Sequence, residues 1–351
     1  MKKTFFEYYR PTKKHMKQMW MDSTFVFDTN VLLGLYEFGP STRTDIFLIL
    51  EKLKDQIWIP HQVGSEFHRD RPELVNRLEG EYAKIEGILD KVVEQIKNEC
   101  KHHPLIDPSI VEANIKESIK YLQEQKVKHP DNLINDGVLK KITKLFKGKV
   151  GAPCSDDLKS KIITEGDPRY SNKIPPGYAD IKKNEDKFGD LIIWYQIIEK
   201  AKETHKSVIF VTNDKKEDWW NYSRKKVLGP RCELIKEIME KSSVDFWMYG
   251  TKMFAKRAKI YLKLPIKDTT ISEIGVVSKT MVIDNELSSP QFAPQAETPD
   301  NESQGATVNQ SIPVVGENIA QVVSSNLDTE PSTSVNEGIA DNTDIILRNK
   351  Q

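Results

Sequence analysis

Two short apolar runs, almost two hundred residues apart, each end in an acidic residue. Residues 24–27 are followed by Asp28, and residues 208–213 are followed by Asp214. Apolar runs of this length are typical of buried strands in a parallel sheet. The carboxyl ends of such strands lie at one edge of the sheet, where open α/β sheets carry their functional groups. The sequence therefore predicts that Asp28 and Asp214 lie at the same edge.

The remaining pattern alternates strands with helices. Strands are predicted at about 24–28, 57–60, 207–213 and 245–249, and helices at 31–38, 42–55, 188–205, 232–241 and 251–262. This alternation predicts an α/β fold in which a parallel sheet carries helices on both faces, connected by right-handed crossovers. The expected α/β core consists of residues 24–72 and 175–264.

A long segment interrupts this alternation. Residues 72–125 are charged and have helical periodicity, with a break at 102–104, which predicts two long helices packed as a hairpin. A shorter basic helix is predicted at 135–147, and residues 148–188 are rich in Gly and Pro, which indicates loops. The segment 73–174 is thus interpreted as a helical and loop insert, and residues 1–23 as a basic, aromatic N-terminal segment.

The overall charge conceals an asymmetry. The chain has 52 Lys+Arg and 52 Asp+Glu, but residues 1–264 contain 48 basic and 39 acidic residues. A basic body fits a nucleic-acid partner, and a solvated surface explains it equally well. Residues 265–351 are acidic and rich in Ser, Thr, Asn and Pro. This composition predicts a disordered acidic tail, because it buries too little apolar surface to offset chain entropy.

The cysteine pattern and the length of the apolar stretches indicate the cellular compartment that we expect. The three cysteines, Cys100, Cys154 and Cys232, form no CxxC pair, which argues against a disulfide scaffold and a zinc site. The N-terminus lacks a signal-peptide core, and no apolar stretch is long enough to span a membrane. We therefore expect a cytoplasmic protein.

Four acidic residues are the candidate site: Asp28, Glu66, Asp190 and Asp214. Carboxylates gathered at a sheet edge repel one another unless a hard cation lies between them, which points to Mg²⁺ or Mn²⁺. Each also has a simpler explanation, because Asp28 and Asp190 suit helix caps, Asp214 suits a turn and Glu66 suits a surface.

Further residues are candidates for supporting roles. Orientation of the ligands or of metal-bound water is assigned to Asn30, Thr212 and Asn213, for which turn and capping chemistry is the equal alternative. Substrate binding is assigned to Arg169, Tyr170, Tyr178, Lys215 and Trp219, with packing in the core or a solvated surface as the alternative. Asp218 is a possible fifth acid, whereas Asp180 is interpreted as a solvated charge.

These motifs together resemble the PIN domain of metal-dependent nucleases, and within it a bacterial PIN-like branch with a large helical insert. The resemblance covers roughly residues 20–262 and lies in these motifs: 25–30, Glu66, 175–180, 188–191, 211–220 and 229–231. It implies a three-layer α/β/α fold in which Asp28, Glu66, Asp190 and Asp214 bind Mg²⁺ or Mn²⁺ and catalyse phosphodiester hydrolysis. It favours RNA as substrate, leaves single-stranded DNA open, and suggests a toxin-like or anti-phage role.

Two other functions compete with this one. A haloacid-dehalogenase-type phosphatase also uses an Asp after its first strand, but it needs a second Asp where this chain has Asn30. A non-catalytic nucleic-acid-binding scaffold is the other alternative, in which the acids serve only as helix caps. A homo-oligomer or a regulatory partner is compatible with each of these readings.

Overall fold

The central element is a four-stranded parallel sheet in the order β2-β1-β3-β6. Its strands are β1 (Thr24–Phe27), β2 (Ile57–Trp58), β3 (Val208–Val211) and β6 (Phe246–Tyr249). In register, Phe27 pairs with Val211, and Val211 pairs with Tyr249. The chain leaves β1 toward one edge and β3 toward the other, so the topological switch point lies between β1 and β3. The predicted parallel α/β sheet is confirmed.

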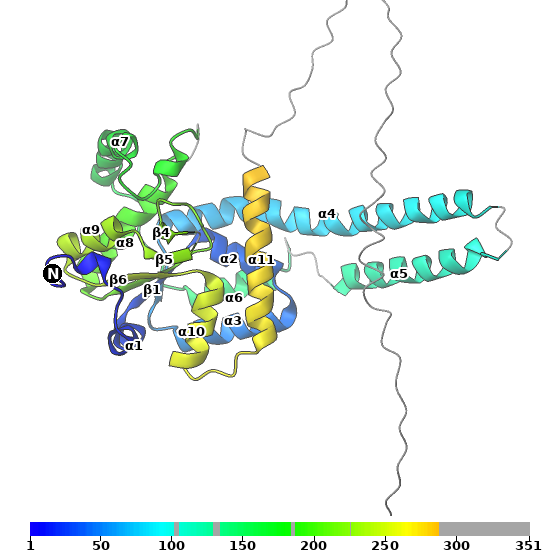
Figure 1. Cartoon of the computed structure of the whole chain (residues 1–351), viewed down its shortest axis with the longest axis horizontal. Coiled ribbons are helices and arrows are strands. Elements are labelled where there is room, and N and C mark those ends of the chain that lie inside the picture. The colour runs from blue at the N-terminus through cyan, green and yellow to red at the C-terminus, as the bar shows by residue number, and fades with distance from the viewer. Residues whose placement is uncertain (102–104, 129–133, 184–186, 225, 288–351) are drawn as a thin grey trace, which may run out of the picture. The chain divides into compact units, whose positions relative to one another are not determined.

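The computed structural model describes residues 1–287 except 102–104, 129–133, 184–186 and 225, with side chains described as far as Ser278. These residues belong to one compact unit (Figure 1). Its helices are α1 (Lys13–Asp22), α2 (Thr29–Glu37), α3 (Pro40–Lys52), α4 (His61–Glu99), α5 (Pro108–Lys128), α6 (Gly137–Leu145), α7 (Asp156–Ser171), α8 (Gly189–Thr204), α9 (Cys232–Ser242), α10 (Thr251–Tyr261) and α11 (Asp268–Leu287). Two short 3₁₀ helices, η1 (Phe6–Tyr8) and η2 (Tyr178–Asp180), and an antiparallel hairpin of β4 (Trp220–Ser223) and β5 (Lys226–Pro230) complete the unit.

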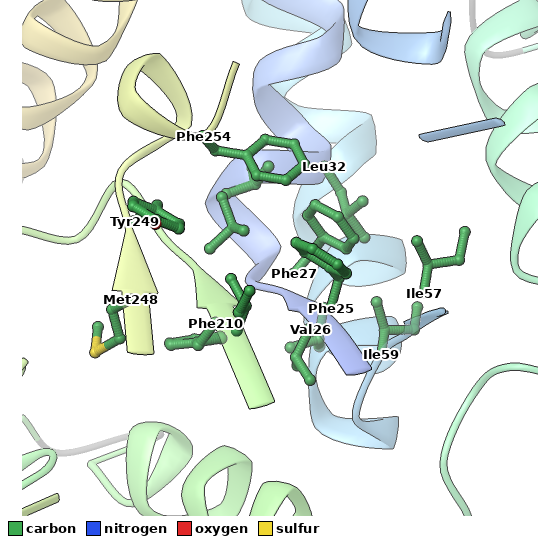
Figure 2. Close-up of a cluster of buried hydrophobic side chains, with 14 of the residues drawn as sticks. Phe25, Val26, Phe27, Leu32, Ile57, Ile59, Phe210, Met248, Tyr249 and Phe254 are labelled. Atoms are coloured by element: carbon green, nitrogen blue, oxygen red, sulfur yellow. The ribbon is translucent and has the colours of Figure 1, made fainter. Parts of the chain in front are cut away.

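Alternating side chains assign the helices to the two faces of the sheet. On one face, Phe25 and Phe27 pack with Phe254 of α10 at ring-centroid distances of 6.0 and 5.5 Å (Figure 2). On the other face, Trp194 of α8 lies 5.1 Å from Phe246 in an edge-to-face arrangement. Because successive strand residues point to opposite faces, these contacts bury the sheet between two helical layers. The expected three-layer α/β/α architecture is therefore present.

The predicted helical hairpin is formed by α4 and α5, which pack side by side (Figure 1). The first helix of this hairpin is longer than predicted, because α4 begins at His61, before residue 72, and continues through Pro72 to Glu99. Leu74 and Val75, directly after the proline, are buried in this helix. Their packing offsets the backbone hydrogen bond that proline removes from a helix.

The rest of the predicted insert belongs to the body. Val138, Ile142 and Leu145 of α6 are buried in the main hydrophobic core. The segment 148–188 is not only loop, because α7 spans Asp156–Ser171 with Ser155 as its N-cap. Leu158 and Ile162 of α7 are also buried in that core. The segments α6 and α7, together with Leu74 and Val75 of α4, thus contribute to the main core.

The predicted disordered tail begins too early, because α11 lies within its first part. Ile266, Thr270, Ile274 and Ser278 are buried at four-residue spacing, which is the spacing of one helix face. Glu273 fixes this helix to the body, since its carboxylate accepts hydrogen bonds from Gly39 N at 2.6 Å and Thr42 Oγ1 at 2.7 Å, at the N-terminus of α3. Residues 288–351 lie outside the described part of the chain. Among the described helices, none has the length and apolarity needed to cross a membrane.

Candidate functional site: a ring of linked carboxylates

The carboxyl ends of the two central strands bring Asp28 next to Thr212. Asp28 is the N-cap of α2, and its Oδ1 accepts a hydrogen bond from Thr29 N at 2.8 Å. Its Oδ2 accepts from Thr212 Oγ1 at 2.5 Å and from Asn30 Nδ2 at 2.6 Å. The predicted capping role is therefore present, but it uses only one carboxylate oxygen. The other oxygen connects β1 to the loop after β3, where Asp214 N donates to Thr212 Oγ1 at 2.9 Å.

Glu66 reaches the same place from the second turn of α4. Its Oε2 accepts from Thr29 Oγ1 at 2.6 Å, and its Oε1 accepts from Gln62 Nε2 at 2.9 Å. The first residue of α8, Gly189, leaves space for this carboxylate, because a Cβ there would lie 3.0 Å from Glu66 Oε1. Glu66 therefore lies between Asp28 and the start of α8, which also carries Asp190.

Lys216 links the remaining carboxylates. Its Nζ lies 3.1 Å from Asp190 Oδ2, 3.0 Å from Asp214 Oδ2 and 2.8 Å from Asp180 Oδ2. The exposed fractions of the side chains are 29% for Lys216, 17% for Asp190, 16% for Asp214 and 10% for Asp180. Through these contacts and those of Thr29 and Thr212, all four predicted acids form one connected group, which we call the carboxylate ring.

Burial, and after it the crowding of negative charge, raises the pKa values of Asp28 and Asp190. Burial raises the pKa of Asp28 to about 6, with further increases from Glu66 and Asp214, against the hydrogen bond from Thr212. Burial also raises the pKa of Asp190 to about 7, and Asp214 and Asp180 add to this against the attraction of Lys216. Conversely, the surrounding carboxylates hold the pKa of Lys216 well above its ordinary value, although burial opposes this. The ring thus carries more negative charge than its one ammonium group balances.

Two further acids lie beside these four: Asp180, whose role was not predicted, and Asp218, which the sequence suggested as a possible fifth acid. Asp180 is buried and bound to Lys216, although a solvated charge was predicted. Asp218 is fully buried, and its Oδ2 accepts hydrogen bonds from Gly177 N at 2.9 Å and Ala179 N at 3.0 Å. Asp218 therefore holds the turn that positions Asp180. The only sequence signal was that both acids lie in motifs of the resemblance, at 175–180 and 215–220.

The donor set suits a hard divalent cation in its chemistry. Carboxylate oxygens are the ligands that Mg²⁺ and Mn²⁺ prefer, and the ring already attracts an ammonium group among three of them. Within the described residues, no three acidic, His or Cys side chains are arranged as a ready ligand set. Protein donors already occupy the oxygens of Asp28 and Glu66, and Lys216 lies among Asp180, Asp190 and Asp214. The carboxylates are thus the right type of ligand for Mg²⁺ or Mn²⁺, and the Lys216 ammonium lies among three of them.

The residues predicted to orient ligands behave differently from one another. Asn30 and Thr212 both donate to Asp28 and so fix its carboxylate. Asn213 uses its side chain elsewhere, because its Oδ1 accepts from Thr251 N at 3.1 Å, at the start of α10. Its backbone N–H donates to Asn30 Oδ1 at 2.8 Å, so that residue contributes to the site through its main chain.

Most of the predicted substrate-binding residues are structural. Trp219 is 1% exposed and packs 5.1 Å from Phe210. Arg169 makes a bidentate pair with Glu237 at 2.8 and 3.0 Å. Tyr170 and Tyr178 are buried as well. In the structure, tertiary partners turn the side chains of these four inward, and their contact with a substrate stays a prediction. The fifth candidate, Lys215, is exposed beside Asp214, and its Nζ donates to Ser278 O at 3.1 Å.

Comparison with known proteins supports the resemblance. A family described as "PIN like domain" matches residues 24–234, which is more than half of the chain and includes the whole carboxylate ring. Searches of curated proteins and of solved structures found no significant match. Members of this family are usually nucleases, act on nucleic acids and typically bind divalent metals. On the strength of this match, the chain belongs to the PIN-like domain family.

Proposed function

We propose that this protein is a metal-dependent nuclease that hydrolyses phosphodiester bonds in RNA. The observation that carries the proposal is the carboxylate ring, in which acids from four separate segments converge at the topological switch point of the sheet. A cluster that gathers this much negative charge costs folding free energy unless a cation repays it. Such an arrangement is expected at a site that binds metal ions for catalysis.

Asp28, Glu66, Asp190 and Asp214 would hold Mg²⁺ or Mn²⁺. When bound, the ion supplies an activated water and neutralises charge on the scissile phosphate. The protein prepares this site in advance. Thr212 anchors Asp28 from the neighbouring strand, and the absence of a side chain at 189 lets Glu66 approach α8.

RNA is favoured over DNA because many PIN-domain nucleases that the chain resembles act on RNA. The same resemblance is the basis for a toxin-like or anti-phage role. Binding without cleavage is the main alternative. The phosphatase alternative is weakened by Asn30, whose Nδ2 donates to Asp28 at 2.6 Å. An amide in this position cannot transfer a proton to a leaving group.

The test is incubation of the purified protein with end-labelled single-stranded RNA, single-stranded DNA and duplexes, in Mn²⁺ or in chelator. Asp28→Asn removes charge from the ring, and Asp167→Asn on the surface of α7 is the matched control. We expect cleavage of RNA in Mn²⁺ by the native protein and the control variant, and none by Asp28→Asn or in chelator. Folding of both variants is checked by circular dichroism.

A modified substrate tests the chemistry. Hydrolysis by water forms a new P–O bond, breaks the bond to the leaving ribose oxygen and does not use the 2′-hydroxyl. A single 2′-deoxyribose at the cleavage position should therefore leave the rate unchanged. Cleavage that persists in chelator, or that equals the native rate in Asp28→Asn, would refute the proposed function. Binding of RNA without cleavage under any metal would favour the scaffold.

A further inference from the structure

A large cavity opens directly beside the carboxylate ring. Its volume is about 1240 Å³, and Thr212, Asn213 and Asp214 form one end of it. Its other walls come from the N-terminal segment with α1, from the hairpin of β4 and β5, and from β6, α10 and α11. The N-terminal segment, β6, α10 and α11 lie outside the region 24–234 that matches the PIN-like family. The cavity is thus built largely by parts of the chain that the family match does not cover.

The charge of the lining is almost entirely positive. Among the described lining residues, Asp214 is the only acid, and six are basic: Arg10, Lys13, Lys17, Lys215, Lys252 and Arg257. Lys13, Lys17 and Lys252 are exposed, and within the described chain none of these three has an ion-pair partner. Positive charge without local acidic partners attracts phosphate groups, and this attraction weakens with added salt.

The interior of the cavity is apolar and aromatic. Its lining includes Trp220, Tyr222, Trp247, Tyr249 and Tyr261. Tyr222 is 37% exposed, and the neighbouring Val227 and Leu228 are also exposed, at 48% and 41%. Aromatic rings flanked by cations are the combination that binds single strands, because unpaired bases stack on the rings while phosphates contact the basic side chains. A duplex keeps its bases paired and cannot use this surface in the same way.

Two contacts connect separate walls of the cavity, and two hydrogen bonds fix its aromatic side chains. Arg10 Nη2 donates to Val227 O at 3.3 Å, which connects the N-terminal segment to β5. At Gly229 the backbone lies on Trp247, where a Cβ would be 3.0 Å from the indole ring. The Tyr222 hydroxyl donates to Lys215 O at 2.7 Å, and Trp220 Nε1 donates to Asp214 O at 2.6 Å. The aromatic wall is therefore fixed to the same loop that carries an acid of the ring.

We infer that this cavity binds the single-stranded nucleic acid substrate, with unpaired bases against the β4–β5 wall and phosphates on the basic residues of α1 and α10. This inference rests on the proposed nuclease function and specifies how its substrate is recognised. A strand bound along the cavity passes Asp214 and so brings a phosphate to the ring. Duplex nucleic acid must open before it can occupy the same surface.

The test measures binding of fluorescent oligonucleotides to the full chain in chelator, where no metal-dependent cleavage takes place. The variants are Lys13→Glu/Lys17→Glu and Tyr222→Ala, and Lys202→Glu beside a separate, smaller cavity is the matched control. We expect single strands to bind more tightly than duplexes. In the Lys13/Lys17 variant, the slope of log affinity against log salt should fall by roughly 1.4, at about 0.7 for each lost phosphate contact. Tyr222→Ala should weaken binding without changing this slope, and the control should match the native protein.

The result also separates this inference from the proposed function. If RNA is cleaved but the Lys13/Lys17 and Tyr222 variants bind like the native protein, the substrate lies elsewhere and the inference fails. If these variants lose binding but no metal supports cleavage, the inference stands and the proposed function fails. Preferential binding of duplexes would also overturn the inference.

An acidic segment of the same chain is the competing occupant. To distinguish it, a photoreactive residue replaces Tyr222 in the full chain, and cross-linked products are identified by mass spectrometry in the presence of a single-stranded oligonucleotide. We expect the oligonucleotide to be captured. Exclusive cross-linking to residues 288–351 would show that the cavity is a docking site for the tail and would contradict the inference.

Discussion

Replacing Lys216 with Met removes the central cation of the carboxylate ring and leaves its acids in place. Lys216 Nζ lies 2.8 to 3.1 Å from oxygens of Asp180, Asp214 and Asp190. At this separation and an effective dielectric constant of about 20, each contact is worth about 5 kcal/mol before the cost of desolvation. Removing one partner of a buried ion pair typically costs about 3–5 kcal/mol. We therefore expect the metal-free variant to lose about 3–5 kcal/mol of unfolding free energy.

A bound divalent cation should compensate for this loss. An ion at a hundred times its dissociation constant stabilises the folded state by about 2.7 kcal/mol. Because the Met variant leaves Asp190 and Asp214 without their ammonium partner, Mn²⁺ should stabilise it more than it stabilises the native protein. The two effects together would identify Lys216 as a cation that occupies the place of a metal.

The assay is urea unfolding at neutral pH, in chelator and in Mn²⁺, for the native protein and two variants. Lys183→Met is the matched control, because Lys183 also contacts Asp180, at 3.0 Å, but its side chain is 56% exposed. An exposed pair of this kind contributes at most about 1 kcal/mol. Equal unfolding midpoints for Lys216→Met and Lys183→Met, with no response to Mn²⁺, would refute this reasoning.

Three further predictions concern Asp28, Arg169 and Gly177. The pKa of folded Asp28 is raised to about 6 from 3.8, so the folded protein retains a proton that the unfolded chain releases. The metal-free unfolding free energy should therefore fall by about 3 kcal/mol as pH rises from about 4 to 7. If urea unfolding gives the native protein and Asp28→Asn parallel pH profiles, this prediction is wrong. Arg169→Met should cost about 1–3 kcal/mol, because Glu237 loses its bidentate partner while Lys241 and Trp194 still contact it. Lower activity at unchanged stability would instead support a substrate role for Arg169. Gly177→Ala should lower the melting temperature, because φ is 94° there and a Cβ would lie 2.2 Å from Tyr170 Oη; an unchanged melting curve would show that the turn relaxes freely.

The sequence predicted the sheet well because its strands are short apolar runs with clear ends. The runs before Asp28 and Asp214 became β1 and β3, which are neighbours in the sheet. The hairpin of β4 and β5 was not predicted, because its strands are short and neither shows a regular alternation of buried and exposed residues. Likewise α7 was interpreted as loop because Gly166 and Pro168 lie inside it. Local composition indicated a break in the helix there, but burial of one face of α7 stabilises the helix through these residues.

The tail boundary shows how averaging hides a helix. Residues 265–351 are polar on average, but every fourth residue from Ile266 to Ser278 is buried. The buried face of α11 consists of a few positions in a polar segment, so the composition of the whole segment does not reveal it. The contacts of Glu273 with Gly39 and Thr42 could not be anticipated either, because they join residues more than two hundred positions apart.

The four acids were predictable as a set because each follows a strand or begins a helix at the sheet edge. The roles of Lys216 and Asp180 were not, since a charged residue in a loop has the same local pattern whether it is solvated or buried against a distant partner. For Arg169 and Trp219 the reverse holds: basic and aromatic residues in a loop-rich segment suggest a binding surface, but Glu237 and Phe210 turn them inward. Contacts with residues distant in sequence thus determine whether such a side chain lies in a binding site or in the hydrophobic core.

The most direct test of the central claim is calorimetric titration of the native protein with Mn²⁺, compared with the Asp28→Asn/Asp214→Asn double variant. The claim predicts saturable binding to the native protein, and binding that is at least tenfold weaker or lost in the double variant, with both proteins folded by circular dichroism. Native protein that binds no Mn²⁺ at millimolar concentration, or a double variant that binds it equally well, would contradict the claim that the carboxylate ring is a metal site.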